Sequence, residues 1–139
     1  MTGDPNCIFC KILRGEIPSV KIHEDEETLA FMDVMPQSPG HCLVIPKNHA
    51  ANIFEVSTDD AAILIRATHR LAQAVNTALK PDGVGLYQFN GSAAGQTVFH
   101  IHFHVIPRYK DVELVMHARD MVDKSVLQPF AEKIKAALR

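Results

Sequence analysis

The stretch His100-Ile101-His102-Phe103-His104-Val105-Ile106 sets histidines in strict alternation with apolar residues. Side chains along a β-strand point alternately to opposite faces. A strand through this stretch therefore places the three imidazoles on one face, with neighbours roughly 6.5 to 7 Å apart. The apolar residues between them point to the other face, where they can pack beneath helices. The alternation predicts a strand with a core on one side and a small polar site on the other.

This histidine row has three interpretations. A solvent-facing polar row is the simplest, but strict alternation inside an apolar strand argues against it. A metal site is the second, because neutral imidazole is the commonest metal ligand in proteins. Nucleophilic catalysis is the third, because imidazole titrates near neutrality, attacks phosphorus, and has its tautomer set by neighbouring groups.

A small polar loop lies just upstream, Asn90-Gly91-Ser92-Ala93-Ala94-Gly95-Gln96-Thr97. It offers backbone N–H groups, the amide of Gln96 and the hydroxyl of Thr97, and its glycines let a ligand approach the backbone closely. Such donors are expected around a phosphoryl group whose charge must be stabilised in a transition state. Beside the histidine row, the loop favours phosphate chemistry.

The remaining periodicities predict an α+β fold with an antiparallel sheet. We expect strands over residues 20–24, 28–33, 41–45, 85–89 and 98–108. A short helix is expected over residues 7–15 and another over 125–138, and the longest over 58–79. Ser57 or Thr58 caps the long helix, Asp59 and Asp60 lie in its first turn, and Lys80-Pro81-Asp82-Gly83 ends it. The acidic run at residues 24–27 is expected to be a solvated turn.

Length and composition narrow the class of protein. The chain has 139 residues, 47% of them hydrophobic, which suits one domain with a real core. Its net charge of −2 argues against a nucleic-acid groove, although a small phosphate ligand needs only a few donors. No apolar run is long enough for a membrane span, and no signal peptide is recognisable. Three cysteines do not make a secreted disulfide framework, so a reducing cytoplasm is the expected compartment.

The sequence resembles the histidine triad family of nucleotide hydrolases and transferases. Residues 100–106 match the family's His-φ-His-φ-His-φ-φ signature without a gap, where φ is an apolar residue. Residues 40–49 resemble the family segment that ends in a separate upstream histidine, here His49, and Asp33 matches the aspartate that ends the preceding strand. The resemblance implies one domain over residues 1–139, with its core at about 7–108 and a tail with a helix at 109–139. The implied fold has a five-stranded antiparallel sheet, one long helix and one or two shorter ones.

The resemblance also implies roles for individual residues. His102 is the expected nucleophile toward the α-phosphorus of a nucleotide, and His104 the group that contacts the phosphate or the leaving group. The implied substrates are nucleoside phosphoramidates or dinucleoside polyphosphates, with adenine as the base and a homodimer as the assembly. A weakly catalytic purine nucleotide-binding regulator is the alternative. The implied nucleotide contacts are Asp33 to the ribose, Asn90, Gln96 and Thr97 to the phosphate, and Ile22 and Phe31 to the base.

The pair Cys7-Ile8-Phe9-Cys10 has metal-ligand spacing. A buried reduced pair and a redox motif are alternatives, but the redox motif is weakly supported, because no strand precedes the pair and no βαβ unit contains it. Zinc requires two further ligands, for which His49 and His100 are the candidates. Some bacterial-type members of the family are similar, which implies a structural zinc site that leaves His102 and His104 free for chemistry. A zinc-dependent hydrolase with all three triad histidines as ligands is a further hypothesis.

Other histidines and the tail give weaker signals. Cys42 is expected in the core, and no partner pattern supports more than a surface or core role for His23, His41, His69 and His117. The segment after Arg108 lacks the tryptophan-containing ending of one branch of the family. Because tail residues help to choose the leaving group there, the resemblance leaves the preferred substrate open.

Overall fold

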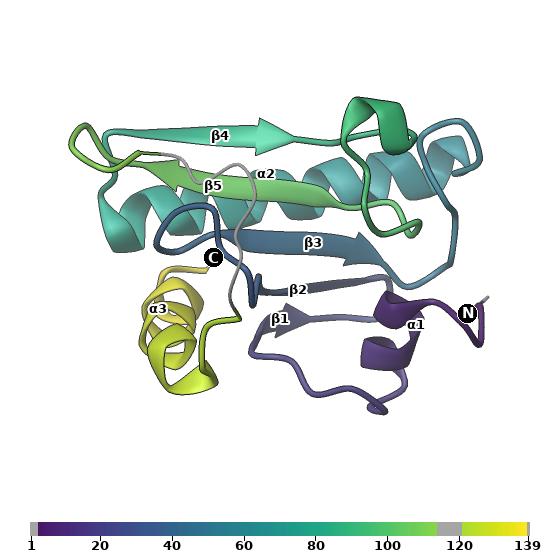
Figure 1. Ribbon diagram of the computed structural model, residues 1–139, viewed down its shortest axis with the longest axis horizontal. Coiled ribbons are helices and arrows are strands. Elements are labelled where there is room, and N and C mark those ends of the chain that lie inside the picture. Colours follow the sequence, from purple (N-terminus) through teal and green to yellow (C-terminus); the bar gives the residue numbers. More distant parts are fainter. Residues whose placement is uncertain (1–2, 114–120, 139) are drawn as a thin grey trace.

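The protein folds as a five-stranded antiparallel sheet with helices on both of its faces (Figure 1). The computed structural model describes residues 3–113 and 121–138. The strands are β1 (Lys21–Glu24), β2 (Thr28–Met32), β3 (Cys42–Pro46), β4 (Gly83–Tyr87) and β5 (Phe103–Arg108), in the order β1-β2-β3-β5-β4. The helices are α1 (Ile8–Leu13), α2 (Thr58–Leu79) and α3 (Lys124–Ala137), with a 3-10 turn η1 (Ser92–Ala94). The predicted fold class is confirmed.

One face of the sheet carries the core beneath α2 and α3. Residues directly opposite one another on paired strands share a face, and Ala30 lies opposite Val44, which lies opposite Phe103. Ile101 and Val105 continue this face and are fully buried, as the alternation predicted. The helices close it with buried apolar side chains of α2 and α3: Leu64, Leu71, Ala74, Val75, Leu127, Ala131 and Ile134.

The other face of the sheet carries α1 and the triad. Phe31 lies opposite Leu43, and Leu43 lies opposite His104, so these side chains form one row. Phe9 and Ile12 of α1 pack with this row in a second, smaller apolar cluster. The sheet thus separates a large helical core from a smaller face on which apolar side chains surround histidines.

Local signals explain the long helix. The Ser57 side chain accepts a hydrogen bond from the backbone N–H of Asp60, and Lys80 ends the helix in the left-handed conformation at φ 48°. The helix covers residues 58–79, as the sequence predicted. The Asp123 side chain caps α3 by accepting a hydrogen bond from the backbone N–H of Ser125, and the helix begins at Lys124, one residue before the predicted start.

The last strand is shorter than predicted. Residues 98–102 precede β5, which begins at Phe103 instead of Val98. His100 instead donates from Nε2 to the carbonyl of Pro46 at 2.7 Å, and Ile101 N–H donates to the carbonyl of Ala50. These bonds turn the chain toward the end of β3, so only His104 of the triad lies on the strand. The strand β4 also differs, since it begins and ends two residues earlier than predicted.

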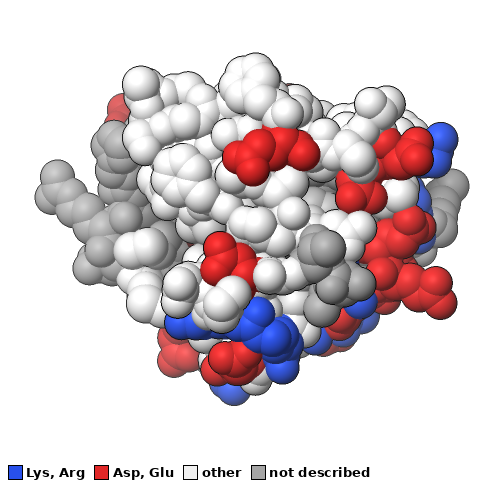
Figure 2. All heavy atoms as spheres, turned by 90° about the vertical axis from the view of Figure 1, so that its right-hand side faces the viewer, with Lys and Arg blue, Asp and Glu red and all other residues white. Residues whose placement is uncertain are grey.

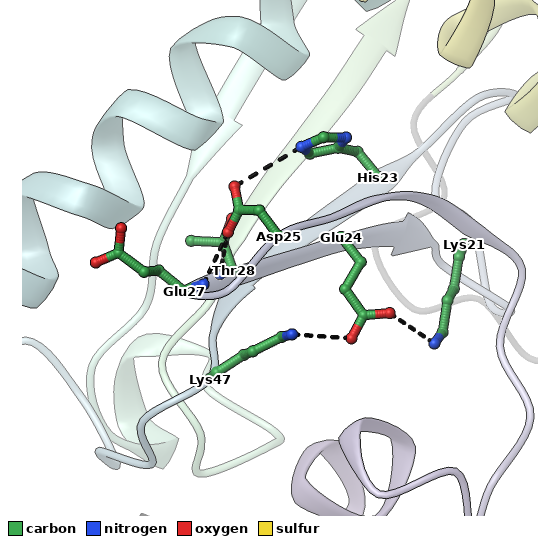
Figure 3. A network of polar contacts seen from close by, with 7 residues as sticks. All are labelled: Lys21, His23, Glu24, Asp25, Glu27, Thr28 and Lys47. Carbon is green, nitrogen blue, oxygen red and sulfur yellow. Dashed lines mark hydrogen bonds and ion pairs between the residues drawn. The ribbon is translucent and has the colours of Figure 1, made fainter. Parts of the chain in front are cut away.

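The β1–β2 turn is a polar network, in agreement with the predicted acidic turn (Figure 3). The Asp25 carboxylate accepts hydrogen bonds from the backbone N–H groups of Glu27 and Thr28 at 2.8 Å. Glu24 forms ion pairs with Lys21 and with Lys47, which lies just beyond β3. The turn is therefore tied to the neighbouring strand by solvated side chains.

Within the described residues, no helix combines the length and the hydropathy required to cross a membrane. His117 and the middle of the tail, at residues 114–120, lie outside the described residues.

Candidate active site and metal centre

The ring of His102 is held by one hydrogen bond and by aromatic neighbours. Its Nδ1 lies 2.7 Å from the carbonyl oxygen of His100, so Nδ1 carries the proton and donates it. The lone pair then lies on Nε2. The side chain is nearly buried, at 6% exposure, and burial lowers its pKa below the usual value. His102 is therefore a neutral imidazole with a basic Nε2 at neutral pH.

His104 is oriented by His41, a residue that the sequence did not single out. The backbone N–H of Gln37 donates to Nδ1 of His41 at 3.0 Å, which leaves the His41 proton on Nε2. That Nε2 lies 2.9 Å from Nδ1 of His104 and donates to it. The proton of His104 is consequently on its own Nε2. A backbone amide thus sets the tautomer of His104 through His41.

Burial keeps both of these histidines neutral. His41 is fully buried, and its pKa is lowered to about 3, by burial first and then by the neighbouring His104 and His102. Burial and the neighbouring His102 lower the pKa of His104 to about 4. His104 therefore offers a neutral N–H donor beside the unprotonated Nε2 of His102, with the two rings 4.8 Å apart.

Asp33 lies at the edge of this network. Its Oδ1 accepts a hydrogen bond from Met35 N–H at 2.8 Å, and its Oδ2 lies 3.4 Å from Nε2 of His41. Burial raises the pKa of Asp33 to about 6, and the bond from Met35 counters part of that rise. The side chain keeps 17% exposure, so one carboxylate edge faces outward.

The cysteine pair and two histidines converge on a single point. Cys7, the N-cap of α1, and Cys10, within α1, meet His49 and His100. All four donor atoms lie within 4.8 Å of one another. His100 Nδ1 is 3.4 Å from Cys7 Sγ, 3.5 Å from Cys10 Sγ and 3.2 Å from His49 Nδ1. The structure thus brings together the four residues that the sequence proposed as metal ligands.

The separations suit a tetrahedral ion. Zinc bonds of about 2.0 Å to nitrogen and 2.3 Å to sulfur place ligand atoms about 3.3 to 3.8 Å apart. His100 donates Nε2–H to the carbonyl of Pro46, so its Nδ1 lone pair faces the cysteines. Two thiols and two imidazoles are a zinc donor set. The other ring nitrogen of His100, Nε2, already donates its hydrogen bond to the carbonyl of Pro46.

A second group of donors, made by Asp33, His41 and His104, is a proton network and not a metal site. Metal binding through Nε2 of His41 would require its proton to move to Nδ1. Nδ1 faces the N–H of Gln37, and two donors cannot share that contact. Among the described residues, neither donor group contains the whole triad. This arrangement argues against a zinc hydrolase that uses all three triad histidines.

The polar loop at residues 90–97 folds back on itself. The Gln96 amide donates to the carbonyls of Ala51 and Val98, and its oxygen accepts the N–H of Gly91. Gln96 is thus buried, and its amide holds the loop through bonds to backbone groups. Gly91 and Gly95 adopt positive φ angles of 94° and 108°, which suit glycine.

Asn90 and Thr97 lie at the two ends of this loop. One amide hydrogen of Asn90 is donated to Gln88, and its oxygen accepts the N–H of Ile53. Thr97 is exposed and lines a cavity of about 310 Å³ together with Cys7 and His49, on the side of the metal centre.

The predicted base contacts divide between the two faces of the sheet. Phe31 lies on the triad face and stacks edge-on with Phe9 at 5.5 Å. Ile22 is 2% exposed and belongs to the core beneath α2 and α3. The structure therefore does not bring Ile22 to the site, because the sheet lies between them.

His41 is the site residue that sequence reasoning missed. A signal was available in the alternation of His41, Leu43 and Ile45, which share one face of a strand. Leu43 is opposite His104, so His41 is the diagonal neighbour of His104. That relation required the pairing of β3 with β5, which the sequence pattern does not specify.

Charge does not dominate this end of the molecule. Figure 2 shows the end that carries α1 as uncharged over much of its area, with Asp and Glu in its upper part and along its right side, and with Lys and Arg mainly toward its lower margin.

Comparisons with known proteins show which family this chain is similar to. The HIT domain family model matches residues 14–111. Adenosine 5'-monophosphoramidase hnt1 of Schizosaccharomyces pombe is 46% identical over 103 residues, which cover 74% of each chain.

Solved structures agree over nearly the whole chain. A Hit-like protein from Bartonella henselae involved in cell-cycle regulation has a TM-score of 0.90 at 44% identity, covering 99% of this chain and 100% of its own. A zinc-bound histidine triad family protein from Mycobacterium smegmatis has a TM-score of 0.84 at 34% identity, covering 97% and 94%. The chain belongs to the HIT domain family, which confirms the resemblance seen in the sequence.

The low pKa of His41 predicts a measurable pH dependence of stability. The unfolded chain binds a proton at this residue below about pH 6.5, whereas the folded chain does not until about pH 3. The contribution of His41 is therefore complete above pH 6.5 and is lost as the pH falls. In His41→Asn, the unfolding free energy should fall less steeply on acidification, by up to about 1.4 kcal/mol per pH unit.

Urea denaturation between pH 7.5 and pH 4.5 measures these slopes. His69→Asn, at an exposed histidine of α2, is the control and should follow the wild type. The raised pKa of Asp33 opposes the trend, so the comparison is between slopes and not between absolute stabilities. Parallel curves for the wild type and His41→Asn would contradict a buried neutral His41.

Proposed function

We propose that this protein is a nucleotide hydrolase that cleaves at the α-phosphate through a covalent nucleotidyl-histidine intermediate. The observation that carries the proposal is the pairing of an unprotonated Nε2 on His102 with an N–H donor on the adjacent His104. These are the two functions that displacement at phosphorus requires, a nucleophile and a proton donor for the leaving group.

In the first step, Nε2 of His102 forms a bond to the α-phosphorus as the bond to the leaving group breaks. His104 Nε2–H donates to the leaving group or to a phosphate oxygen. In the second step, a water molecule forms the new oxygen–phosphorus bond as the bond to His102 breaks, and the proton that the water loses replaces the one that His104 gave to the leaving group. Imidazole suits both steps because it is a fair nucleophile and a fair leaving group.

Other residues of the site bind the nucleotide in this proposal. The partly exposed Asp33 carboxylate accepts hydrogen bonds from the ribose hydroxyls, and Asn90 and Thr97 donate to the phosphate or the leaving group. Phe31 contributes to the base contact. The fungal phosphoramidase supports adenosine phosphoramidates as substrates with adenine as the base, and dinucleoside polyphosphates share the same α-phosphate chemistry.

The nucleophile is tested by His102→Ala with adenosine 5'-phosphoramidate as substrate. Turnover should fall by more than about 1,000-fold, because removing a nucleophile leaves only binding and electrostatic effects. His69→Ala, at an exposed histidine on α2, should retain wild-type rates. Rapid quenching of the wild type should trap a base-stable, acid-labile adenylate on His102.

Two outcomes of this experiment have distinct meanings. Wild-type turnover by His102→Ala would contradict the nucleophile. Nucleotide binding without a trapped adenylate or turnover would favour the regulatory protein instead. Running dinucleoside polyphosphates at equal concentration identifies the preferred leaving group.

We also propose that Cys7, Cys10, His49 and His100 hold a structural zinc ion. Their convergence supports this proposal, as does the similar zinc-bound protein from Mycobacterium smegmatis. When bound, zinc supplies a fixed cross-link and takes no part in bond cleavage. It leaves the nucleophile role to His102.

Removing the cysteine ligands tests the zinc proposal. The double variant Cys7→Ser, Cys10→Ser should contain no zinc by elemental analysis and should melt at a lower temperature, because metal binding contributes to folding. Cys42→Ala is the control, since this fully buried thiol belongs to the core and zinc content should be unchanged. Full zinc content in the double variant would exclude these ligands.

A homodimer is proposed from the free edge of the sheet. Among the residues that the structure describes, β4 is an edge strand of apolar and small residues that pairs with β5 alone, and its Leu86 is 46% exposed. Pairing of two such edges would satisfy the outer backbone groups and cover this surface.

Light scattering after gel filtration tests this assembly. The wild type should have the mass of two chains, and Leu86→Lys should shift it toward one chain by burying an unpaired charge. Val126→Lys, at a 53% exposed residue of α3, should remain dimeric. A monomeric wild type at micromolar concentration would contradict the dimer.

A further inference from the structure

Phe9 lies between the two cysteines and faces the proposed nucleophile. Its ring is 5.1 Å from that of His102 at an interplanar angle of 85°, the edge-to-face geometry that aromatic pairs prefer. The same ring lies 5.9 Å from His100 and 5.5 Å from Phe31. Phe9 is 6% exposed, so this contact is part of a packed cluster.

The nucleophile needs such a contact to keep its direction. The hydrogen bond from Nδ1 to the carbonyl of His100 defines a tautomer, but one bond does not prevent the ring from tilting. The rings of Phe9 and His104 both lie against His102. Together, these rings restrict the directions in which the Nε2 lone pair can point.

The position of Phe9 depends in turn on the cysteine cluster. The helix α1 has six residues, too few to be stable alone. Cys7 caps it through its thiol, which accepts the N–H of Cys10, and both thiols lie near His49 or His100. A metal at this centre would join the segment that carries Phe9 to the segment that carries His102, because His100 is a shared member.

We infer that Phe9 is a positioning residue for His102, through which occupancy of the metal centre sets the orientation of the nucleophile. This inference rests on the proposed function. It goes beyond it by assigning the metal centre an effect on the rate of the chemical step in addition to stability. Phe9 itself does not react, and it acts by packing alone.

The main test compares Phe9→Leu with the wild type on adenosine 5'-phosphoramidate. Leucine keeps an apolar side chain but removes the ring, so kcat should fall by about 10- to 100-fold, the range expected for small displacements of a reacting group. KM should change less than about threefold. Ile12→Val, on the same helix and in the same apolar cluster, is the control and should retain the wild-type kcat.

Metal removal gives a second, independent comparison. Treatment of the wild type with a zinc chelator should lower kcat by a factor similar to the substitution. In Phe9→Leu, the same treatment should lower kcat by a smaller factor, because two changes that act through the same contact with His102 are not additive. Equal fold-losses in both proteins would mean that the metal does not act through Phe9.

Nitrogen-15 NMR of the histidine rings tests the inference without any substrate. The His102 signals, assigned by their loss in His102→Asn, should report one tautomer with the proton on Nδ1 in the wild type. Phe9→Leu should broaden or shift these signals, and Ile12→Val should not. This readout holds even when the proposed substrate is not turned over, so it separates the two proposals.

Two results would overturn the inference. An increase of KM with an unchanged kcat in Phe9→Leu would make Phe9 a base contact, with the proposed function intact. Unchanged His102 signals together with an unchanged kcat would remove any role for Phe9 beyond core packing. Thermal melting of both variants verifies that they are folded.

Discussion

His100 makes contacts in three directions, two through its imidazole and one through its backbone carbonyl, and the arrangement of the site follows from them. Its Nε2–H donates to the carbonyl of Pro46 at the end of β3, and its Nδ1 faces the two cysteine thiols. The backbone carbonyl of His100 accepts a hydrogen bond from Nδ1–H of His102. A fully buried imidazole with both nitrogens engaged has one possible tautomer and one orientation. His100 therefore fixes the positions of the sheet, the metal centre and the nucleophile relative to one another.

The same logic governs the other side of the site. Gln37 N–H, His41 and His104 form a chain of hydrogen bonds in which each proton position follows from the one before. Burial lowers the pKa of His41 and of His104, so neither ring is charged, and each keeps its donor and acceptor role in these hydrogen bonds. The two sets of hydrogen bonds leave different groups free to act, a lone pair on Nε2 of His102 and an N–H on His104. Two identical side chains therefore acquire different chemical roles from backbone groups.

In this HIT family fold, the sheet separates the larger hydrophobic core from the face that carries the functional side chains. The face beneath α2 and α3 supplies the larger hydrophobic core, with residues such as Val44 and Ile101 fully buried. The opposite face carries the smaller cluster in which Phe9 and Phe31 surround the histidines. Alternation along the chain at residues 100–105 accompanies this division, because each triad histidine is followed by an apolar residue on the core side.

The sequence alone determined the parts of this protein that depend on local order. The alternation at residues 100–106 assigned His104 and Val105 to opposite faces, and capping residues gave the bounds of the long helix. The spacing of Cys7 and Cys10 indicated a donor pair. Only the tertiary structure decided which strands are neighbours, and hence that His41 contacts His104. It also decided that the Ile22 side chain lies on the face of the sheet opposite the site. It also decided that Gln96 holds its own loop and that β5 begins only at Phe103. These features arise from hydrogen bonds and packing between residues distant in sequence, which local patterns do not encode.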